Sequence, residues 1–147
     1  MDQRMSLITL GVQDVARARA FYERLGWTAS SESQEGCAFF QAGGTVLALY
    51  GRADLARDLG QEAGGPPGAG VTLALNVADP AAVESTIAGF VEAGGTLVKP
   101  AHKAFWGGTI GFVADPDGFI WEIAFNPFWT FDSRGNVVLP DSARDAS

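Results

Sequence analysis

Cysteine and histidine are scarce in this sequence, and the scarcity of cysteine excludes two kinds of bond. Cys37 is the only cysteine among 147 residues, so no disulfide can form within the chain and no zinc site can be built from several cysteines. Cys37 lies in a predicted strand with no histidine nearby in the sequence, which favours an unreactive buried thiol. His102 is the only histidine.

Long apolar runs and an excess of basic charge are also missing. No apolar run reaches the roughly 18 residues that a membrane span needs, and residues 1–10 lack the pattern of a signal peptide. We therefore expect a soluble protein of the reducing cytoplasm. The 10 basic and 17 acidic residues give a net charge of −7, which disfavours binding to nucleic acids and to anionic membranes.

What the sequence does contain indicates a folded protein. Hydrophobic residues make up 47% and charged residues 18%, a balance that allows a buried core. A chain of this length forms one globular domain or two small repeated modules. The sequence has no phosphate-binding loop, dinucleotide-binding, nucleophile-elbow or CxxC motif, so several large enzyme classes are not indicated.

The first half predicts the order strand, helix, three strands. Apolar residues in 7–12 predict a strand, and Asp14 is a suitable N-cap for a helix over 15–25 that ends at Gly26. The pair Gly43-Gly44 predicts a tight hairpin between two of the strands that follow. Those three strands are expected at 27–32, 36–42 and 45–51.

The second half repeats this order after a glycine- and proline-rich linker at 53–70, whose beginning can form a short helix. A strand is expected at 71–77, and Asp79-Pro80 caps a second helix that ends at Gly94-Gly95. Asp115–Gly118 has the composition of a turn. The remaining strands are expected at 96–100, 108–114 and 118–125.

The two halves match in sequence as well as in order. Asp14 and Asp79 each link a strand to a capped helix, and they are 65 residues apart. We interpret the chain as a duplicated βαβββ unit of the α+β class.

Short motifs in both halves occur together in one known superfamily. They are Val12-Gln13-Asp14, Ala20-Phe21-Tyr22, Leu25-Gly26-Trp27, Phe105–Gly108, Asp115–Glu122, Asn126-Pro127 and Gly135–Pro140. From about residue 5 to 140, these motifs resemble the vicinal oxygen chelate superfamily, which includes glyoxalase I, bleomycin resistance proteins and extradiol dioxygenases.

This resemblance implies two βαβββ modules whose sheets form paired half-barrels around a cavity. It also divides the chain into one domain with a terminal extension and a tail that we expect to be disordered. The expected boundaries are 5–52 for module one, 53–70 for the linker, 71–126 for module two, 127–140 for the extension and 141–147 for the tail.

Catalytic members of the superfamily hold a divalent metal by His, Gln or Glu side chains from the first and last strands of a module. Here the first-strand positions fall on Leu7 and Thr72, and only Glu122 matches a ligand position. Leucine has no donor atom, and a neutral threonine hydroxyl is a weak ligand for a transition metal. We therefore predict that the usual metal site, and with it the usual cofactor, is absent.

Glu122 and His102 are the candidate acid or base residues. Phe105 and Trp106 lie beside two glycines in a predicted loop, where aromatic side chains can stack on a flat ligand. The predicted ligand-binding residues are Trp106, Phe105, Thr9, Thr72, Asn76 and Tyr50.

Three functions are compatible with these residues, and we favour the first. The first is a dimeric small-molecule binding protein that sequesters an aromatic or cationic ligand, as bleomycin resistance proteins do. The second is a metal-dependent lyase or dioxygenase with a non-standard metal site, for example one formed by His102 with Glu122 or one that uses ligands from a partner chain. The third is a metal-free enzyme that uses Glu122 or His102 as its acid or base.

Overall fold

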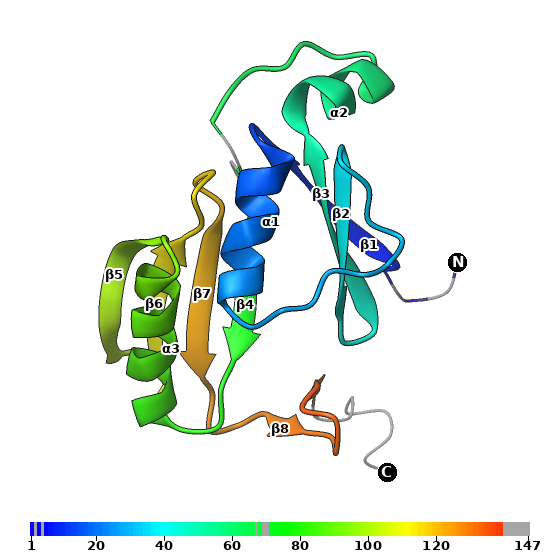
Figure 1. Cartoon of the computed structure of the whole chain (residues 1–147). Coiled ribbons are helices and arrows are strands. Elements are labelled where there is room, and N and C mark those ends of the chain that lie inside the picture. Colours follow the sequence, from blue (N-terminus) through cyan, green and yellow to red (C-terminus); the bar gives the residue numbers. More distant parts are fainter. Residues whose placement is uncertain (2, 4, 67, 69–70, 140–147) are drawn as a thin grey trace.

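The structure, a computed structural model, describes residues 1, 3, 5–66, 68 and 71–139. It contains the two predicted modules, each with one sheet, and confirms the α+β class (Figure 1). The first sheet has the order β1-β3-β2, with β1 parallel to β3 and β2 antiparallel to it. The elements of module one are β1 (Leu7–Val12), α1 (Val15–Arg24), β2 (Cys37–Ala42) and β3 (Thr45–Gly51). We count with it α2 (Arg52–Leu59), the short helix predicted at the beginning of the linker.

Helix α1 begins where the sequence predicts. The carboxylate of Asp14 accepts a hydrogen bond from the amide of Arg17 at 3.0 Å, which satisfies one free donor of the first turn. Gly26 follows the helix with φ of 97°, a conformation that glycine adopts without strain. The hairpin between β2 and β3 turns at Gly43-Gly44, as predicted.

The strand predicted at 27–32 is wrong. This segment contributes only an isolated bridge between Ala29 and Phe40. The reason lies in two serines, Ser30 within the segment and Ser33 just after it, whose hydroxyls bind backbone amides that a strand would pair. The Ser30 hydroxyl accepts from the Glu32 amide at 3.2 Å. The Ser33 hydroxyl accepts from the Phe39 amide at 2.9 Å, and the Ser33 amide donates to the Ser30 carbonyl in a turn.

Module two repeats the architecture with a complete sheet of order β4-β7-β6-β5, again with the first and last strands parallel. Asp79 caps α3 through the amide of Ala82 at 2.8 Å, and Pro80 is the first helical residue, as predicted. Its elements are β4 (Leu73–Asn76), α3 (Pro80–Glu92), β5 (Thr96–Lys103), β6 (Thr109–Ala114) and β7 (Ile120–Phe125).

Strand β5 is longer than the sequence predicts. The expected end at Pro100 does not occur, because β5 lies at the edge of the sheet, where a residue without an amide hydrogen is tolerated. The pairing of β5 with β6 shifts twice, between Leu97 and Lys99 and between Lys99 and His102. His102 therefore lies in a strand and not in the predicted loop.

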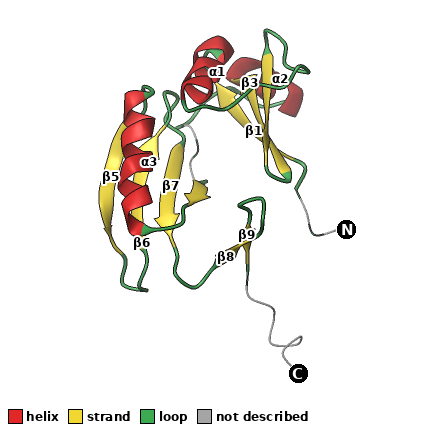
Figure 2. Cartoon of the chain, turned by 60° about the horizontal axis from the view of Figure 1, so that its bottom comes forward, coloured by secondary structure: helices red, strands yellow, loops and turns green. Residues whose placement is uncertain are grey.

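The two modules share one hydrophobic core. Helix α3 covers one face of the second sheet, and α1 lies between the sheets (Figures 1 and 2). The ring of Phe21 on α1 packs on Phe90 of α3, with centroids 6.0 Å apart, and Tyr22 packs on Trp121 of β7 at 6.2 Å. Because both sheets turn a face toward this core, their other faces point outward.

After β7, the chain forms a two-stranded ribbon, β8 (Thr130–Phe131) and β9 (Val137–Val138), which we call the C-terminal ribbon. The predicted disorder of 141–147 concerns residues outside those described. In the described part of the chain, no helix combines the length and the apolar character needed to cross a membrane.

Candidate functional site

The outward face of the second sheet carries Glu122. Side chains alternate along β7, so Trp121 and Ile123 are buried in the core and Glu122 points the other way. In the neighbouring strands, Glu122 pairs with Ala74 of β4 and Phe112 of β6. We call this side of the second sheet the Glu122 face.

Strand register brings His102 to the same face. His102 pairs with Ile110, Ile110 pairs with Ala124, and Ala124 pairs with Asn76, so these four side chains form one row across the sheet. The neighbouring row contains Ala74, Glu122, Phe112 and Lys99. The predicted residues His102, Glu122 and Asn76 thus share one face.

Sequence analysis missed Lys99 on this face. The alternation of a strand ending at Pro100 gives no reason to single it out, and its row becomes visible only through the irregular register of β5. Lys99 is exposed, whereas His102, Phe112 and Glu122 are half-buried. The Glu122 face therefore offers a carboxylate, an aromatic ring and, toward the edge strand, a cation and an imidazole.

The outward face of the first sheet is neutral at the matching positions. Thr9 pairs with Ala48, and Ala48 pairs with Phe39, in the same register that joins Ala74 to Glu122 and Phe112. Ala48 thus stands in module one where Glu122 stands in module two. We call this side of the first sheet the Thr9 face, and Leu7 is half exposed on it.

The residues present do not fit the divalent metal that the superfamily implies. The equivalent positions of the two modules hold Leu7, Ala48, Thr72 and Glu122, of which only the glutamate is a good ligand. Within the described residues, no three His, Cys, Asp or Glu side chains lie close enough together to hold one ion.

Tyr50, which was predicted to bind a ligand, forms a hydrogen bond with a residue of α2. Its hydroxyl donates to a carboxylate oxygen of Asp58 at 3.0 Å, and this hydrogen bond raises the pKa of the phenol. Helix α2 also packs against Gly11, where a Cβ atom would lie 3.1 Å from the side chain of Leu55. One end of the Thr9 face is therefore covered by α2.

Phe105 and Trp106 lie in the turn between β5 and β6. Phe105 is fully exposed. Trp106 is half-buried because its indole folds back over Gly108, where a Cβ atom would overlap the ring. The ring of Phe128 lies 3.7 Å from the Cβ position of Gly107, so this end of the module is rich in aromatic surface.

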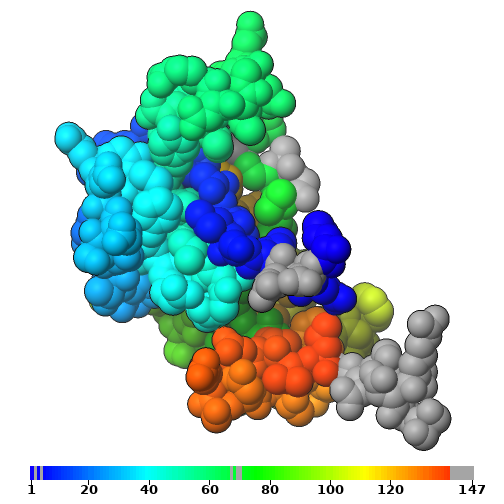
Figure 3. All heavy atoms as spheres, turned by 90° about the vertical axis from the view of Figure 1, so that its right-hand side faces the viewer, coloured from blue at the N-terminus to red at the C-terminus, as the bar shows by residue number. Residues whose placement is uncertain are grey.

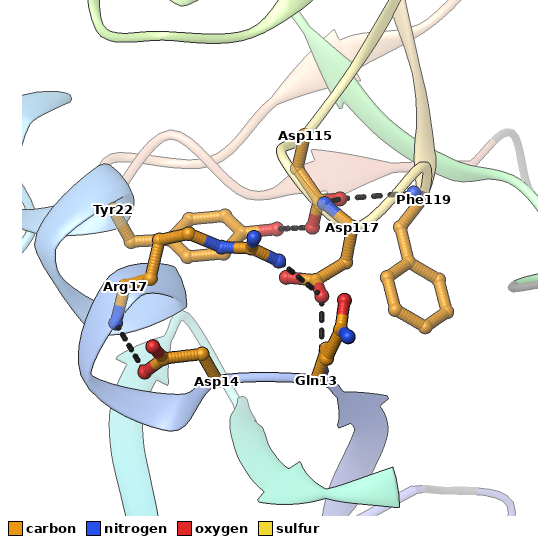
Figure 4. A network of polar contacts seen from close by, with 7 residues as sticks. All are labelled: Gln13, Asp14, Arg17, Tyr22, Asp115, Asp117 and Phe119. Atoms are coloured by element: carbon orange, nitrogen blue, oxygen red, sulfur yellow. Dashed lines mark hydrogen bonds and ion pairs between the residues drawn. The ribbon is translucent and has the colours of Figure 1, made fainter.

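The superfamily motifs themselves meet in a buried network that sequence analysis did not anticipate (Figure 4). The hydroxyl of Tyr22 donates to Asp115 at 2.8 Å and accepts from the indole nitrogen of Trp121 at 3.2 Å. The other oxygen of Asp115 accepts from the amides of Asp117 and Phe119, both at 2.9 Å. Burial raises the pKa of Asp115, and burial with the adjacent Asp115 raises the pKa of Tyr22.

Asp117 extends this contact to the start of α1. One of its oxygens accepts from the amide of Gln13 and from the guanidinium of Arg17, both at 3.0 Å. Its side chain is only 4% exposed, and its second oxygen has no partner among the described residues. The turn Asp115–Gly118 therefore joins module two to module one through hydrogen bonds and is not part of the Glu122 face.

Cys37 lies at the start of β2 as a free thiol. Burial raises the pKa of this thiol, which lowers the fraction of reactive thiolate at neutral pH. Cys37 is half-buried and not fully buried as predicted, and its lack of reactivity stays a prediction.

A cleft of about 620 Å³ lies between the modules, and two of the predicted ligand-binding residues, Thr72 and Asn76, contribute to its lining. The structure does not bring the other predicted residues to it: Thr9, Tyr50, His102, Phe105, Trp106 and Glu122 all lie outside this lining.

Comparison with known proteins agrees with this architecture. Residues 4–123 match the Glyoxalase/Bleomycin resistance protein/Dioxygenase superfamily, so the chain belongs to this superfamily. A glyoxalase-related enzyme from Fulvimarina pelagi has 36% sequence identity and a TM-score of 0.84, with 95% of this chain and 100% of that chain covered.

More distant structures share the fold. A hypothetical protein from S. aureus has 24% identity and a TM-score of 0.74, over 86% of this chain and 95% of that one. A lactoylglutathione lyase from Agrobacterium tumefaciens has 21% identity and a TM-score of 0.65, over 88% and 98%. No curated protein matches the sequence.

Proposed function

We propose that this protein is a cytoplasmic small-molecule binding protein that takes a planar, cationic aromatic ligand on the Glu122 face without a metal ion. The observation that carries the proposal is the composition of this face. A single half-buried carboxylate lies between the methyl group of Ala74 and the ring of Phe112, and the matching positions of module one are neutral.

The chemistry of these neighbours supports a cation with a flat ring. Phe112 offers a ring for stacking, and an aromatic face also attracts a cation. Glu122 supplies the opposite charge in surroundings that are partly shielded from water, where a charge pair is stronger than at an open surface. The net charge of −7 favours the approach of a cation.

A second copy of the chain completes the site in this proposal. The Glu122 face and the Thr9 face both point away from the shared core, so neither covers the other within one chain. Pairing the Glu122 face of one copy with the Thr9 face of another would exclude water from the ligand and bury Leu7. We therefore propose a homodimer.

The direct test of the ligand class is a titration with proflavine, a planar aromatic cation, beside acridine, its uncharged analogue at pH 7.5. We expect Glu122→Gln to weaken proflavine binding about tenfold and to leave acridine binding nearly unchanged, because one charge pair is lost. Glu35→Gln, which removes an exposed glutamate from a loop, is the matched control. Equal binding of proflavine to the wild type and Glu122→Gln would contradict the proposal.

The same preparations test the metal. Titration with Zn²⁺ and Ni²⁺ should show no tight stoichiometric site. An ion bound at one per chain and lost in Glu122→Gln would instead support the metal-dependent alternative.

Dimer formation has its own test. Leu7→Glu should shift the sedimentation of the protein toward the monomer, because a charge would be buried in the contact. Leu59→Glu is the control, since Leu59 is 60% exposed and Leu7 is 50% exposed, but Leu59 lies on α2. Equal sedimentation of the two variants would rule out a dimer through the Thr9 face.

One observation favours a second candidate, a metal-free enzyme. His102 and Glu122 lie in neighbouring rows of the same face, and an imidazole with a carboxylate can move protons at neutral pH. In that case Glu122→Gln would abolish turnover of a substrate that it still binds.

A further inference from the structure

The cleft between the modules forms a second site, and we infer that it binds a planar aromatic anion. It shares Ala74 and Asn76 of β4 with the border of the Glu122 face, but Glu122 itself lies outside it. We call it the inter-module cleft. It lies between the end of the first sheet, the edge strand β4 and the C-terminal ribbon. Its volume of about 620 Å³ falls in the range of small-molecule sites.

Two indole rings contribute to the lining. Trp27 and Trp121 pack edge to face, with centroids 5.9 Å apart and planes at 89°. The indole nitrogen of Trp121 already donates to Tyr22, and Trp121 is 6% exposed, so it offers the cleft a narrow part of its ring and no free donor. The side chains of Ile8 and Leu73 also line the cleft. Such walls favour a flat, apolar ring system.

The charge in the cleft has one sign. Among the described residues that line it, Arg134 is the only charged one, although the chain as a whole carries a net charge of −7. Arg134 forms no ion pair with another described residue. A guanidinium in this position can bind a carboxylate through two parallel hydrogen bonds.

The carboxylate of Asp132, in the turn of the C-terminal ribbon, already accepts hydrogen bonds from neighbouring residues. One oxygen of Asp132 accepts from the amides of Arg134 and Asn136, and the other accepts from the side-chain amide of Asn136 at 3.1 Å. These bonds lower the pKa of Asp132 and fix the turn that presents Arg134. An anionic ligand therefore meets an available cation at this turn.

The C-terminal ribbon forms one wall of the cleft. It lies below the end of the first sheet, as the space-filling view shows (Figure 3). The side-chain oxygen of Asn136 approaches Gly43 so closely that a Cβ atom there would lie 2.7 Å away. The ribbon contains only two cross-strand pairs. A ligand held by Arg134 on one side and by the indoles on the other would span the cleft from ribbon to core.

The test uses 2-naphthoate and its uncharged counterpart naphthalene-2-methanol, followed by the four indole N–H signals of the full chain in nitrogen-15 NMR spectra. We expect 2-naphthoate to shift the signals of Trp27 and Trp121 and to leave those of Trp106 and Trp129 unchanged. Arg134→Gln should weaken 2-naphthoate binding about tenfold and change the binding of naphthalene-2-methanol less than twofold.

Two control variants separate this site from other effects. Arg57→Gln removes one exposed positive charge far from the cleft and should leave both affinities unchanged. Glu122→Gln should also leave 2-naphthoate binding unchanged, so failure of the Glu122 proposal and failure of this one give different results. Absence of 2-naphthoate binding, shifts confined to Trp106 and Trp129, or equal losses in Arg134→Gln and Arg57→Gln would each overturn the inference.

Discussion

The two modules share a strand order and a register but differ in the chemistry of their outward faces. In module one, Thr9, Ala48 and Phe39 form a neutral row, and the matching row of module two contains Ala74, Glu122 and Phe112 and continues to Lys99. The first sheet has three strands and the second has four. A duplicated unit has thus kept its backbone pairing while only one copy carries charge.

The faces of the two sheets that point toward the core are alike in their chemistry. There both modules supply large apolar side chains to one cluster, which includes Leu49 and Phe40 from the first sheet and Ile123 and Val113 from the second. We conclude that the inward faces of the two sheets determine stability together, whereas their outward faces can differ in function. Stability and binding should therefore respond to different substitutions.

The largest expected effect is on the contact that joins the modules. Asp115→Ala leaves the Tyr22 hydroxyl and the amides of Asp117 and Phe119 without their acceptor in a buried place. We expect the free energy of unfolding to fall by about 3 kcal/mol or more, measured by urea denaturation. The transition should stay single, because both modules contribute to one core.

Asp58→Ala is the control for this variant. It removes an exposed hydrogen bond to Tyr50 within module one and should cost about 0.5 kcal/mol or less. Two separate transitions in Asp115→Ala, or a loss as small as that of Asp58→Ala, would show that the modules are independent.

A smaller effect is expected for Tyr22→Phe, which removes one donor to Asp115 and should cost about 1–3 kcal/mol at pH 8. The pKa of Tyr22 is raised in the folded chain, so the folded protein keeps a proton that the unfolded chain loses above about pH 10. Stability from this group is complete below that pH and falls as the pH rises above it, by up to about 1.4 kcal/mol per pH unit.

The alkaline loss of stability should therefore be weaker in Tyr22→Phe than in the wild type. Tyr50→Phe is the control, because its phenol is bonded to Asp58 outside the shared core. Urea denaturation at pH 8 and at about pH 10.5 compares the three proteins. An unchanged slope in Tyr22→Phe would show that Tyr22 does not hold its proton in the folded chain.

The smallest effect concerns two arginines of the same helix. Arg17→Gln removes the partner of Asp117, which is 4% exposed, and should cost about 1 kcal/mol. Arg19→Gln breaks a pair with Glu23 in which both side chains are about 40% exposed, and should cost less than about 0.5 kcal/mol. Thermal unfolding of both variants decides whether the contact between modules outweighs a contact within one helix.

Local sequence signals predicted much of this fold. The caps at Asp14 and Asp79, the first helical position of Pro80 and the turn at Gly43-Gly44 depend on residues close together in the sequence, and all are confirmed. The strand predicted at 27–32 is wrong because the Ser30 hydroxyl binds the amide of Glu32 and the Ser33 hydroxyl binds the amide of Phe39, its expected partner in the neighbouring strand. His102 was placed in a loop because Pro100 indicates the end of a strand unless that strand lies at an edge.

The candidate site was less predictable, because it depends on contacts between residues that are far apart in the sequence. Tyr22 and Asp115 are 93 residues apart, so nothing in the sequence near either residue indicates their hydrogen bond. The position of Glu122 followed from the alternation of one strand, but its neighbours Phe112 and Lys99 required the register of two further strands. The charge of the inter-module cleft depends on a ribbon that sequence analysis gave no structure.

The proline in β5 has a consequence for the behaviour of the protein at high concentration. An open sheet edge presents free amides that can recruit strands from other molecules and start fibrils. Pro100 has no amide hydrogen, the two shifts in register bend the strand, and Lys99 and Lys103 place positive charge along it. Together these features should protect this edge of the molecule against aggregation in a crowded cell.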